Sequence, residues 1–188
     1  MRKLILEEWL SLDGFAEDQK GQLDFFPPSH ENRYSDLDQL KFLDSVDTMI
    51  LGRKTYELFA AFWPEATSEQ EVIAEKLNSL NKIVFSTTLK QAPWGKWPAA
   101  QVMNGDLVSE IKKLKQTNGK DIVIWGSLSL AQSLMKHQLI DEYHIQLCPT
   151  MTGGGRRLFP DLSQYQKLRL VEVRPYESGA LFLSYIPL

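Results

Sequence analysis

Three short segments of this sequence carry glycine, hydroxyl or cationic residues of the kinds that bind phosphate. They are Gly52-Arg53-Lys54-Thr55, Ser86-Thr87-Thr88 and Gly126-Ser127-Leu128-Ser129. Backbone N–H groups at the start of a helix bind anions together with the positive end of the helix dipole, and cationic or hydroxyl side chains add further donors. The first segment is not a P-loop, because Asp47 stands where that motif has its first glycine. These residues indicate binding of a phosphorylated ligand.

Each of the three segments follows a predicted buried strand. The strands are expected at 48–51, 82–85 and 121–125, and helices are expected after Gly52 and Gly126. Ligands of open α/β sheets bind beyond the carboxyl ends of the strands, which meet at one edge. One strand-glycine-helix turn fits plain packing as well as binding, but three at the same edge favour a dinucleotide. No segment reads Gly-x-Gly-x-x-Gly, so a Rossmann site is not indicated.

The rest of the chain alternates predicted strands and helices, as an α/β sheet requires. A strand over 4–10 leads into Ser11-Leu12-Asp13-Gly14, where the glycine suits a turn. Further elements are expected as helices over 32–46, 56–62, 68–80 and 106–115, a strand over 140–149 and a final hairpin of 168–173 and 180–186. The tract 93–98 is predicted to be a surface loop. The sequence thus predicts one domain over residues 1–188, with a mixed, mostly parallel sheet flanked by helices and a C-terminal antiparallel hairpin.

Composition excludes several classes of protein. The formal net charge of −3 over 188 residues argues against a nucleic-acid or acidic-membrane partner. Glu7 and Glu8 interrupt the N-terminal apolar run, and no apolar run approaches the ~18 residues of a membrane span, so a cytoplasmic protein is expected. Cys148 is the only cysteine, which leaves neither an internal disulfide nor a zinc deaminase signature. The three histidines lack metal-ligand spacing, so no metal is expected.

Several motifs, taken in order, resemble the dihydrofolate reductase superfamily. They are Ser11-Leu12-Asp13-Gly14, Leu51-Gly52-Arg53-Lys54-Thr55-Tyr56-Glu57, Lys82-Ile83-Val84-Phe85-Ser86-Thr87 and Trp125-Gly126-Ser127. The later segments Leu139-Ile140-Asp141-Glu142, Pro149, Gly153-Gly154-Gly155 and Leu158-Phe159 are typical of one branch, the C-terminal reductase domain of the riboflavin-biosynthesis deaminase-reductase. The resemblance covers essentially the whole chain.

This resemblance implies a dihydrofolate reductase-like three-layer sandwich and a stand-alone reductase that uses NADPH and forms a homodimer. The implied activity is similar to that of 5-amino-6-(5-phosphoribosylamino)uracil reductase, which acts on a small heteroaromatic substrate. Two alternatives stay open: a dihydrofolate or pterin reductase, and a non-catalytic dimeric protein that binds a nucleotide.

The resemblance also assigns residues to the cofactor. Gly52, Arg53, Lys54 and Thr55 would hold the pyrophosphate and the adenosine 2′-phosphate, and Ser86 and Thr87 would contact the 2′-phosphate side. Gly126, Ser127, Leu128, Ser129 and Leu130 would receive the pyrophosphate and the nicotinamide half, and Trp9 and Leu10 would lie against the nicotinamide. Folate reductases have a second glycine where this chain has Ser127.

For catalysis the resemblance offers two carboxylates, Asp13 and Asp36. Asp36 has the spacing from Gly52 of the buried carboxylate of folate reductases, but a carboxylate near a helix start is stabilising in any case. Asp13 is the preferred residue of the substrate site, because its Leu-Asp-Gly setting matches the riboflavin branch. The substrate is expected between Asp13, Phe15, Trp63 and Pro149, and Arg156 and Arg157 are either its phosphate ligands or solvated surface charges.

Overall fold

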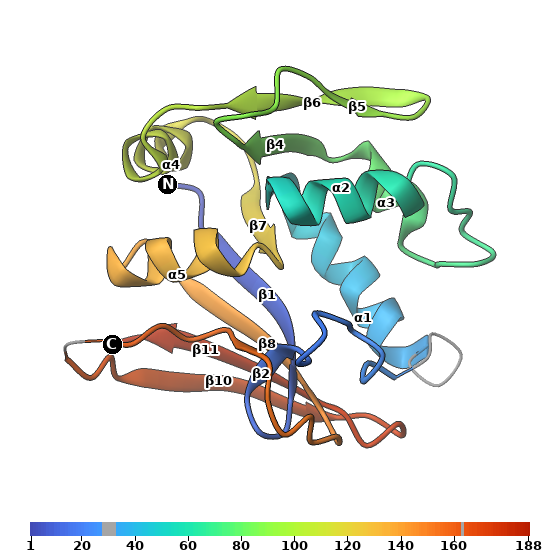
Figure 1. Cartoon of the computed structure of the whole chain (residues 1–188), viewed down its shortest axis with the longest axis vertical. Coiled ribbons are helices and arrows are strands. Elements are labelled where there is room, and N and C mark those ends of the chain that lie inside the picture. The colour runs from blue at the N-terminus through green and yellow to red at the C-terminus, as the bar shows by residue number, and fades with distance from the viewer. Residues whose placement is uncertain (28–32, 163) are drawn as a thin grey trace.

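The computed structural model describes residues 1–27, 33–162 and 164–188, and a nine-stranded sheet dominates it (Figure 1). The strand order is β10-β11-β8-β1-β7-β3-β4-β6-β5. The five neighbouring pairs from β8 to β6 are parallel, and the three pairs that include β10, β11 or β5 are antiparallel. This topology confirms the predicted mixed sheet with a C-terminal hairpin.

The strands are β1 (Leu4–Ser11), β2 (Phe15–Glu17), β3 (Val46–Gly52), β4 (Asn81–Phe85), β5 (Ala92–Trp94), β6 (Trp97–Met103), β7 (Asp121–Trp125), β8 (Glu142–Cys148), β9 (Arg156–Arg157), β10 (Leu168–Pro175) and β11 (Leu181–Pro187). The helices are α1 (Arg33–Phe42), the 3₁₀ turn η1 (Leu43–Ser45), α2 (Arg53–Phe62), α3 (Ala74–Ser79), α4 (Leu107–Gln116) and α5 (Leu128–Lys136). The short strands β2 and β9 pair with each other outside the main sheet.

Helices cover both faces of the large sheet, which gives three layers (Figure 1). The apolar runs of the central strands explain this, because alternate side chains of a strand point to opposite faces. Ile50 of β3 and Ile124 of β7 are fully buried on the face covered by α4 and α5. Met49 of β3 and Val123 of β7 are fully buried on the other face, which α2 and α3 cover. Two cores therefore hold the central strands, and their carboxyl ends form a rigid edge.

The tract 93–98 is not a surface loop, as the sequence had suggested, but part of the antiparallel β5–β6 hairpin. Trp94 pairs with Trp97 across a turn in which Gly95 has a φ of +53°. Trp94 is 1% exposed, and its indole N–H donates to Oδ1 of Asn78 at 2.6 Å. The prolines suggested a loop, yet Pro93 lies in the edge strand β5, where one side of the strand needs no ladder bonds, and Pro98 lies in β6 before its pairing with β4 begins at Gln101.

Two helices are shorter than predicted. The helix expected over 68–80 is reduced to α3, with turns before it. The helix expected over 32–46 ends at Phe42 and passes through η1 into β3, which Val46 begins; its expected start at residue 32 lies outside the described residues.

Candidate functional site

A cleft of about 320 Å³ opens at the carboxyl edge of the central strands. Residues 7–9 of β1, the end of β7, the helices α1 and α2 and the start of α5 contribute to its lining. Five aromatic side chains contribute to the lining: Trp9, Phe26, Phe59, Trp63 and Trp125. Trp9 stacks on Phe26 with ring centroids 5.3 Å apart, and Phe59 lies 6.0 Å from Trp63 and 6.2 Å from Trp125. Such walls suit a flat, aromatic ligand.

Asp36 reaches the cleft from α1. It is half-buried, and no hydrogen-bond donor among the described residues contacts its carboxylate. Burial raises the pKa of Asp36 to about 6, and the nearby Glu71 adds to the shift. A carboxyl group with this pKa holds a proton in part of the molecules near neutral pH and can give it to a bound ligand.

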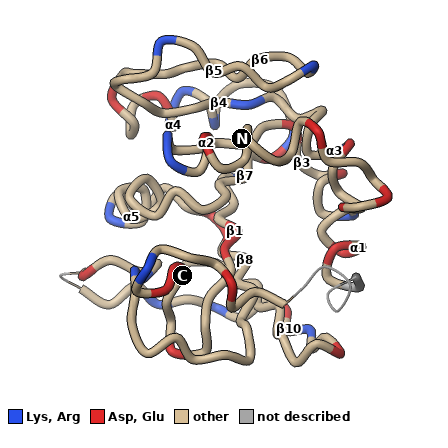
Figure 2. The backbone as a smooth tube through the Cα atoms, turned by 45° about the vertical axis from the view of Figure 1, so that its right-hand side comes forward, with Lys and Arg blue, Asp and Glu red and all other residues tan. Residues whose placement is uncertain are grey.

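Two further acids, Glu7 and Glu8, lie in the middle of β1, which runs through the centre of the molecule (Figure 2). Glu7 is 3% exposed. Its carboxylate accepts hydrogen bonds from the indole N–H of Trp125 at 2.9 Å and from Nε2 of Gln39 at 3.0 Å. Burial raises the pKa of Glu7, against the lowering effects of His144 and of these two donors.

Neither Glu7 nor Glu8 was predicted from the sequence to be a site residue. The available signal was that two charged residues stand inside an otherwise apolar strand. Burying a charge is costly unless it is paired and hydrogen-bonded, so such residues are candidates for a functional site.

The β3–α2 and β7–α5 turns are joined by hydrogen bonds. The backbone N–H of Gly52 donates to Oγ of Ser127 at 2.6 Å, and the N–H of Ser127 donates to Oγ1 of Thr55 at 2.9 Å. Gly126 has a φ of +53°, and a Cβ there would lie 3.1 Å from Oγ1 of Thr55, so glycine permits the close approach. Ser127 has the left-handed angles φ 57° and ψ 46°, which are unusual for a residue with a side chain.

The same turns leave two helix N-termini side by side. Gly52 and Ser127 are the N-cap residues of α2 and α5, and neither helix has a side-chain cap. Backbone N–H groups in the first turn of each helix are thus available to a ligand, next to the positive ends of two helix dipoles.

Arg53 connects the segment Ser86-Thr87-Thr88 to these turns. Its Nη1 donates to Oγ1 of Thr88 at 3.0 Å, and its Nε pairs with Glu57 at 2.7 Å. Oγ of Ser86 accepts from the N–H groups of Thr88 and Leu89 and so closes its own turn. The three segments therefore lie together at one edge of the sheet, and Lys54 and Thr87 are exposed there.

Asp13 lies outside the cleft lining. Its carboxylate accepts from Oγ of Ser11 at 2.6 Å and from the backbone N–H groups of Thr152 and Gly153 at 3.2 and 2.8 Å. These donors, the Ser11 hydroxyl first, hold the pKa of Asp13 below its ordinary value. Asp13 thus ties the end of β1 to the glycine loop at 152–155.

Some of the other predicted site residues line the cleft, and others do not. Those that line the cleft are Trp9, Asp36, Thr55, Trp63, Gly126, Ser127 and Leu128. Phe15 and Pro149 do not line it, and Leu10 and Leu130 are buried in the core of the α5 face.

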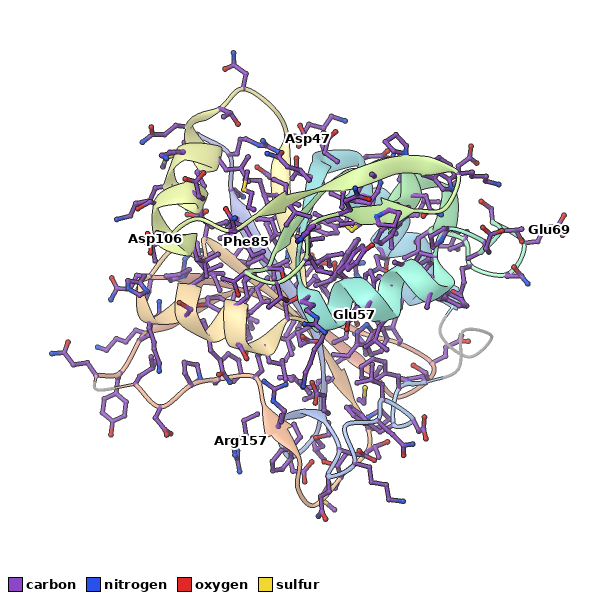
Figure 3. All side chains as sticks on the ribbon, turned by 45° about the horizontal axis from the view of Figure 1, so that its top comes forward. Asp47, Glu57, Glu69, Phe85, Asp106 and Arg157 are labelled. Carbon is purple, nitrogen blue, oxygen red and sulfur yellow. The ribbon has the colours of Figure 1, made fainter. Side chains whose placement is uncertain are left out.

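The two predicted substrate arginines also lie outside the cleft lining. The Arg157 guanidinium lies 4.6 Å from the ring centroid of Phe15, and in Figure 3 Arg157 stands well below the helix that carries Glu57. Arg156 contacts Glu17 at 3.3 Å and Oγ of Ser129, in the first turn of α5, at 3.2 Å. Arg156 is therefore closer to the paired helix N-termini than to the aromatic walls.

In the described part of the chain, no helix is long and apolar enough to cross a membrane. The same residues contain no group of three or more His, Cys, Asp or Glu side chains arranged to hold a metal ion.

The sheet and the helices on its two faces form three layers, with a cleft at the carboxyl edge of the strands beside two uncapped helix N-termini. This architecture defines a dihydrofolate reductase-like α/β protein. Dihydrofolate reductase from Enterococcus faecalis, solved with NADP(H), has this fold, with a TM-score of 0.63 at 18% identity over 98% of this chain and 96% of that one. The model of the RibD C-terminal domain family matches residues 2–182, and the chain belongs to that family.

The similarity to other proteins extends over nearly the whole chain. The uncharacterized protein YyaP of Bacillus subtilis is 30% identical over 186 residues, which are 98% of this chain and 94% of YyaP. A provisionally assigned riboflavin biosynthesis protein from Shewanella sp. PV-4 has a TM-score of 0.75 at 22% identity, covering 100% of this chain and 99% of that one. The deaminase/5-amino-6-(5-phosphoribosylamino)uracil reductase of Thermotoga maritima has a TM-score of 0.68 at 15% identity, and the match covers 57% of it.

Proposed function

We propose that this protein is an NADPH-dependent reductase of a small heteroaromatic substrate. The observation that carries the proposal is the cleft itself, where aromatic walls and the half-buried acid Asp36 adjoin two uncapped helix N-termini. A flat ring fits the walls, an anion fits the helix ends, and Asp36 lines the same cleft from α1. Membership of the RibD C-terminal domain family supports an oxidoreductase.

The residues present fit a dinucleotide with an extra phosphate. The joined turns at Gly52 and Ser127 offer backbone donors for the pyrophosphate, and Arg53 and Lys54 stand at the same edge for the 2′-phosphate. When bound, NADPH supplies the hydride. The protein supplies the orientation of the two reactants and excludes water from between them.

Asp36 is the proton donor in this proposal. Reduction of a C=N or C=O bond adds one hydride and one proton, and the protonated Asp36 carboxyl group can supply the proton. Asp13 is already occupied by three donors of its own chain, so we assign it a structural role.

The riboflavin precursor named in the Thermotoga relative is the physiological candidate substrate that the family suggests. Its heterocycle fits the aromatic walls. Among the described side chains no lysine or arginine lines the cleft, so its ribose phosphate would have to reach Arg156 or the solvent.

Two experiments test the proposal. Calorimetric titration should show NADPH binding in preference to NADH. A screen of pterins, the ribosylaminopyrimidine and small carbonyl compounds should show NADPH consumption that Asp36→Asn lowers strongly. Binding without turnover of any compound would favour the non-catalytic alternative, and absence of NADPH binding would overturn the proposal. Growth of a riboflavin-reductase-deficient strain carrying this gene tests the riboflavin assignment separately.

We also infer that the protein forms a homodimer, as the resemblance implies. The strand β10 forms one edge of the sheet and exposes Leu170, Val171 and Val173, which are 49%, 51% and 53% exposed. Apolar side chains on an exposed strand edge favour association. Light scattering after gel filtration should give twice the mass of the chain, and a monomer at micromolar concentration would contradict the inference.

A further inference from the structure

The second acid of β1, Glu8, has surroundings unlike those of its neighbour Glu7. Side chains alternate along a strand, so Glu8 lies on the α5 face of the sheet with Leu4 and Leu6, whereas Glu7 lies on the face of α1. Glu7 accepts hydrogen bonds from two side chains. Glu8 has one partner: its Oε1 accepts from the backbone N–H of Trp9 at 3.1 Å, and its Oε2 is buried without a hydrogen-bond partner among the described residues.

The environment of Glu8 does not favour a negative charge. Glu8 is 7% exposed and lines the cleft. The ionisable groups that act on it are Glu7 on β1 and Glu17 on β2, both acidic. Two further acids, Asp36 and Glu71, line the same cleft, and Arg156 of β9 pairs with Glu17. Burial first, and Glu7 and Glu17 in addition, raise the pKa of Glu8 to about 8, so the neutral form predominates at pH 7.

A neutral carboxyl group changes the hydrogen-bonding role of Oε2. A protonated Oε2 is a donor, and a buried donor without an acceptor is both costly and uncommon in native proteins. Glu8 lines the cleft, and a rotation of its carboxyl group would present this donor to an acceptor on a bound ligand. Phosphate is the wrong partner, because Glu7 and Glu17 would repel it. A neutral carbonyl oxygen suits this position.

The inference rests on the proposed NADPH-dependent function and on the expectation, implied by the resemblance, that Trp9 and Leu10 lie against the nicotinamide. We propose that the neutral carboxyl group of Glu8 donates a hydrogen bond from Oε2 to the carboxamide oxygen of the nicotinamide half of the cofactor. Glu8 is then a binding and specificity residue for the cofactor that acts independently of the phosphate contacts and of Asp36. Cofactor affinity depends on the protonation of this one side chain.

The test is calorimetric titration of the wild type, Glu8→Gln and Glu8→Leu with NADP⁺ from pH 7 to pH 9.5. Wild-type affinity should fall by about fivefold or more over this range as Glu8 loses its proton. Glu8→Gln keeps a donor at every pH, so its affinity should match the wild type at pH 7 and stay level. Glu8→Leu should bind about threefold to tenfold more weakly at pH 7, also without pH dependence.

Two controls separate this effect from others. Adenosine 2′,5′-bisphosphate lacks the nicotinamide, so its affinity over the same range should be the same for the wild type and Glu8→Gln. Glu172→Gln, on β10 outside the cleft, should behave as the wild type. Melting temperatures measured for each variant show that it is folded.

The outcomes are distinct. Wild-type affinity that is level from pH 7 to pH 9.5, or a Glu8→Gln profile that falls as the wild type does, would overturn the role of Glu8 and leave the reductase proposal standing. Absence of NADP⁺ binding to the wild type at any pH would overturn both.

Discussion

Asp13 and Asp36 are the two carboxylates that the sequence placed in the site, and the folded chain surrounds them differently. Asp13 receives three hydrogen bonds, from the Ser11 hydroxyl and from the backbone of Thr152 and Gly153, and these hold its pKa low. Asp36 has no donor among the described residues, and burial raises its pKa to about 6. Asp13 lies in the turn after β1, and Asp36 lies on α1.

The difference shows how a structural acid can be told from one available to a ligand. Hydrogen bonds to the charged form favour ionisation, whereas burial without donors favours the neutral form. Asp13 has most of its acceptor capacity filled by its own chain and stays charged. Asp36 can exchange a proton and accept hydrogen bonds from a ligand. We therefore expect substitutions of the two residues to affect different properties.

The largest effect is expected for Asp36→Asn. With a substrate found by screening, kcat/KM at pH 6 should fall by about 10²- to 10³-fold, because asparagine cannot supply the proton. Wild-type activity should decline as the pH rises above about 6, since the protonated form of Asp36 is depleted, and the variant should lack this limb. NADPH affinity, measured by calorimetry, should not change.

Asp38→Asn is the matched control for this prediction. Asp38 lies on the same helix but pairs with Lys41 and Arg174, outside the cleft lining. If Asp38→Asn lost as much activity as Asp36→Asn, the helix rather than the acid would be responsible.

The second prediction concerns the loop that Asp13 holds. In Gly155→Ala the new Cβ would lie 1.8 Å from the backbone oxygen of Glu17, and the φ is +135°. The backbone must move, so urea unfolding should show a loss of about 3 kcal/mol or more. Gly153→Ala has no atom within 4 Å of its Cβ and a φ of +69°, and it should lose only about 1 kcal/mol. Equal losses would mean that the close approach to β2 is unimportant.

The third prediction separates two arginines. Arg53→Ala should weaken NADPH binding by about 1.5–3 kcal/mol and leave NADH binding nearly unchanged, because only NADPH has the 2′-phosphate that we assign to Arg53. Arg157→Ala is the control, since Arg157 lies over Phe15 outside the cleft lining. Calorimetric titration of both variants with NADPH and with NADH measures the four affinities that test this assignment. An equal loss for NADPH and NADH would remove Arg53 from the 2′-phosphate.

The sequence predicted the central sheet well, because its evidence is local. The apolar runs of β3, β4 and β7, each ending in a polar turn, are visible in a short window. The ends of the sheet were less predictable. The β5–β6 hairpin contains Pro93 and Gly95, which look like loop residues until Trp94 is seen to be buried against Asn78.

The site was predictable only in part, since side-chain partners are a property of the fold. The sequence named Asp36, Trp63 and the turns at Gly52 and Gly126, and residues of all of these line the cleft or bond to its lining. It could not show that Asp13 is occupied by Thr152 and Gly153, because those donors are more than a hundred residues away in the chain.

The last prediction sets the two carboxylates against each other through the pH dependence of stability. The pKa of Asp13 is lowered in the folded protein, so its contribution to stability is present above the ordinary value of 3.8 and is lost as the pH falls through the folded value. Asp13→Asn should therefore unfold at lower urea concentration than the wild type at pH 7, and the difference should shrink toward pH 3.

The pKa of Asp36 is raised from 3.8 to about 6, so the favourable contribution of the neutral form is present below 3.8 and is lost as the pH rises through 6. Asp36→Asn should accordingly be at least as stable as the wild type at pH 8, with its advantage disappearing at low pH. Urea midpoints of the three proteins from pH 3 to pH 8 measure both effects. Differences of the same sign for the two variants at pH 8 would show that Asp36, like Asp13, is held by its own chain and is not available to a ligand.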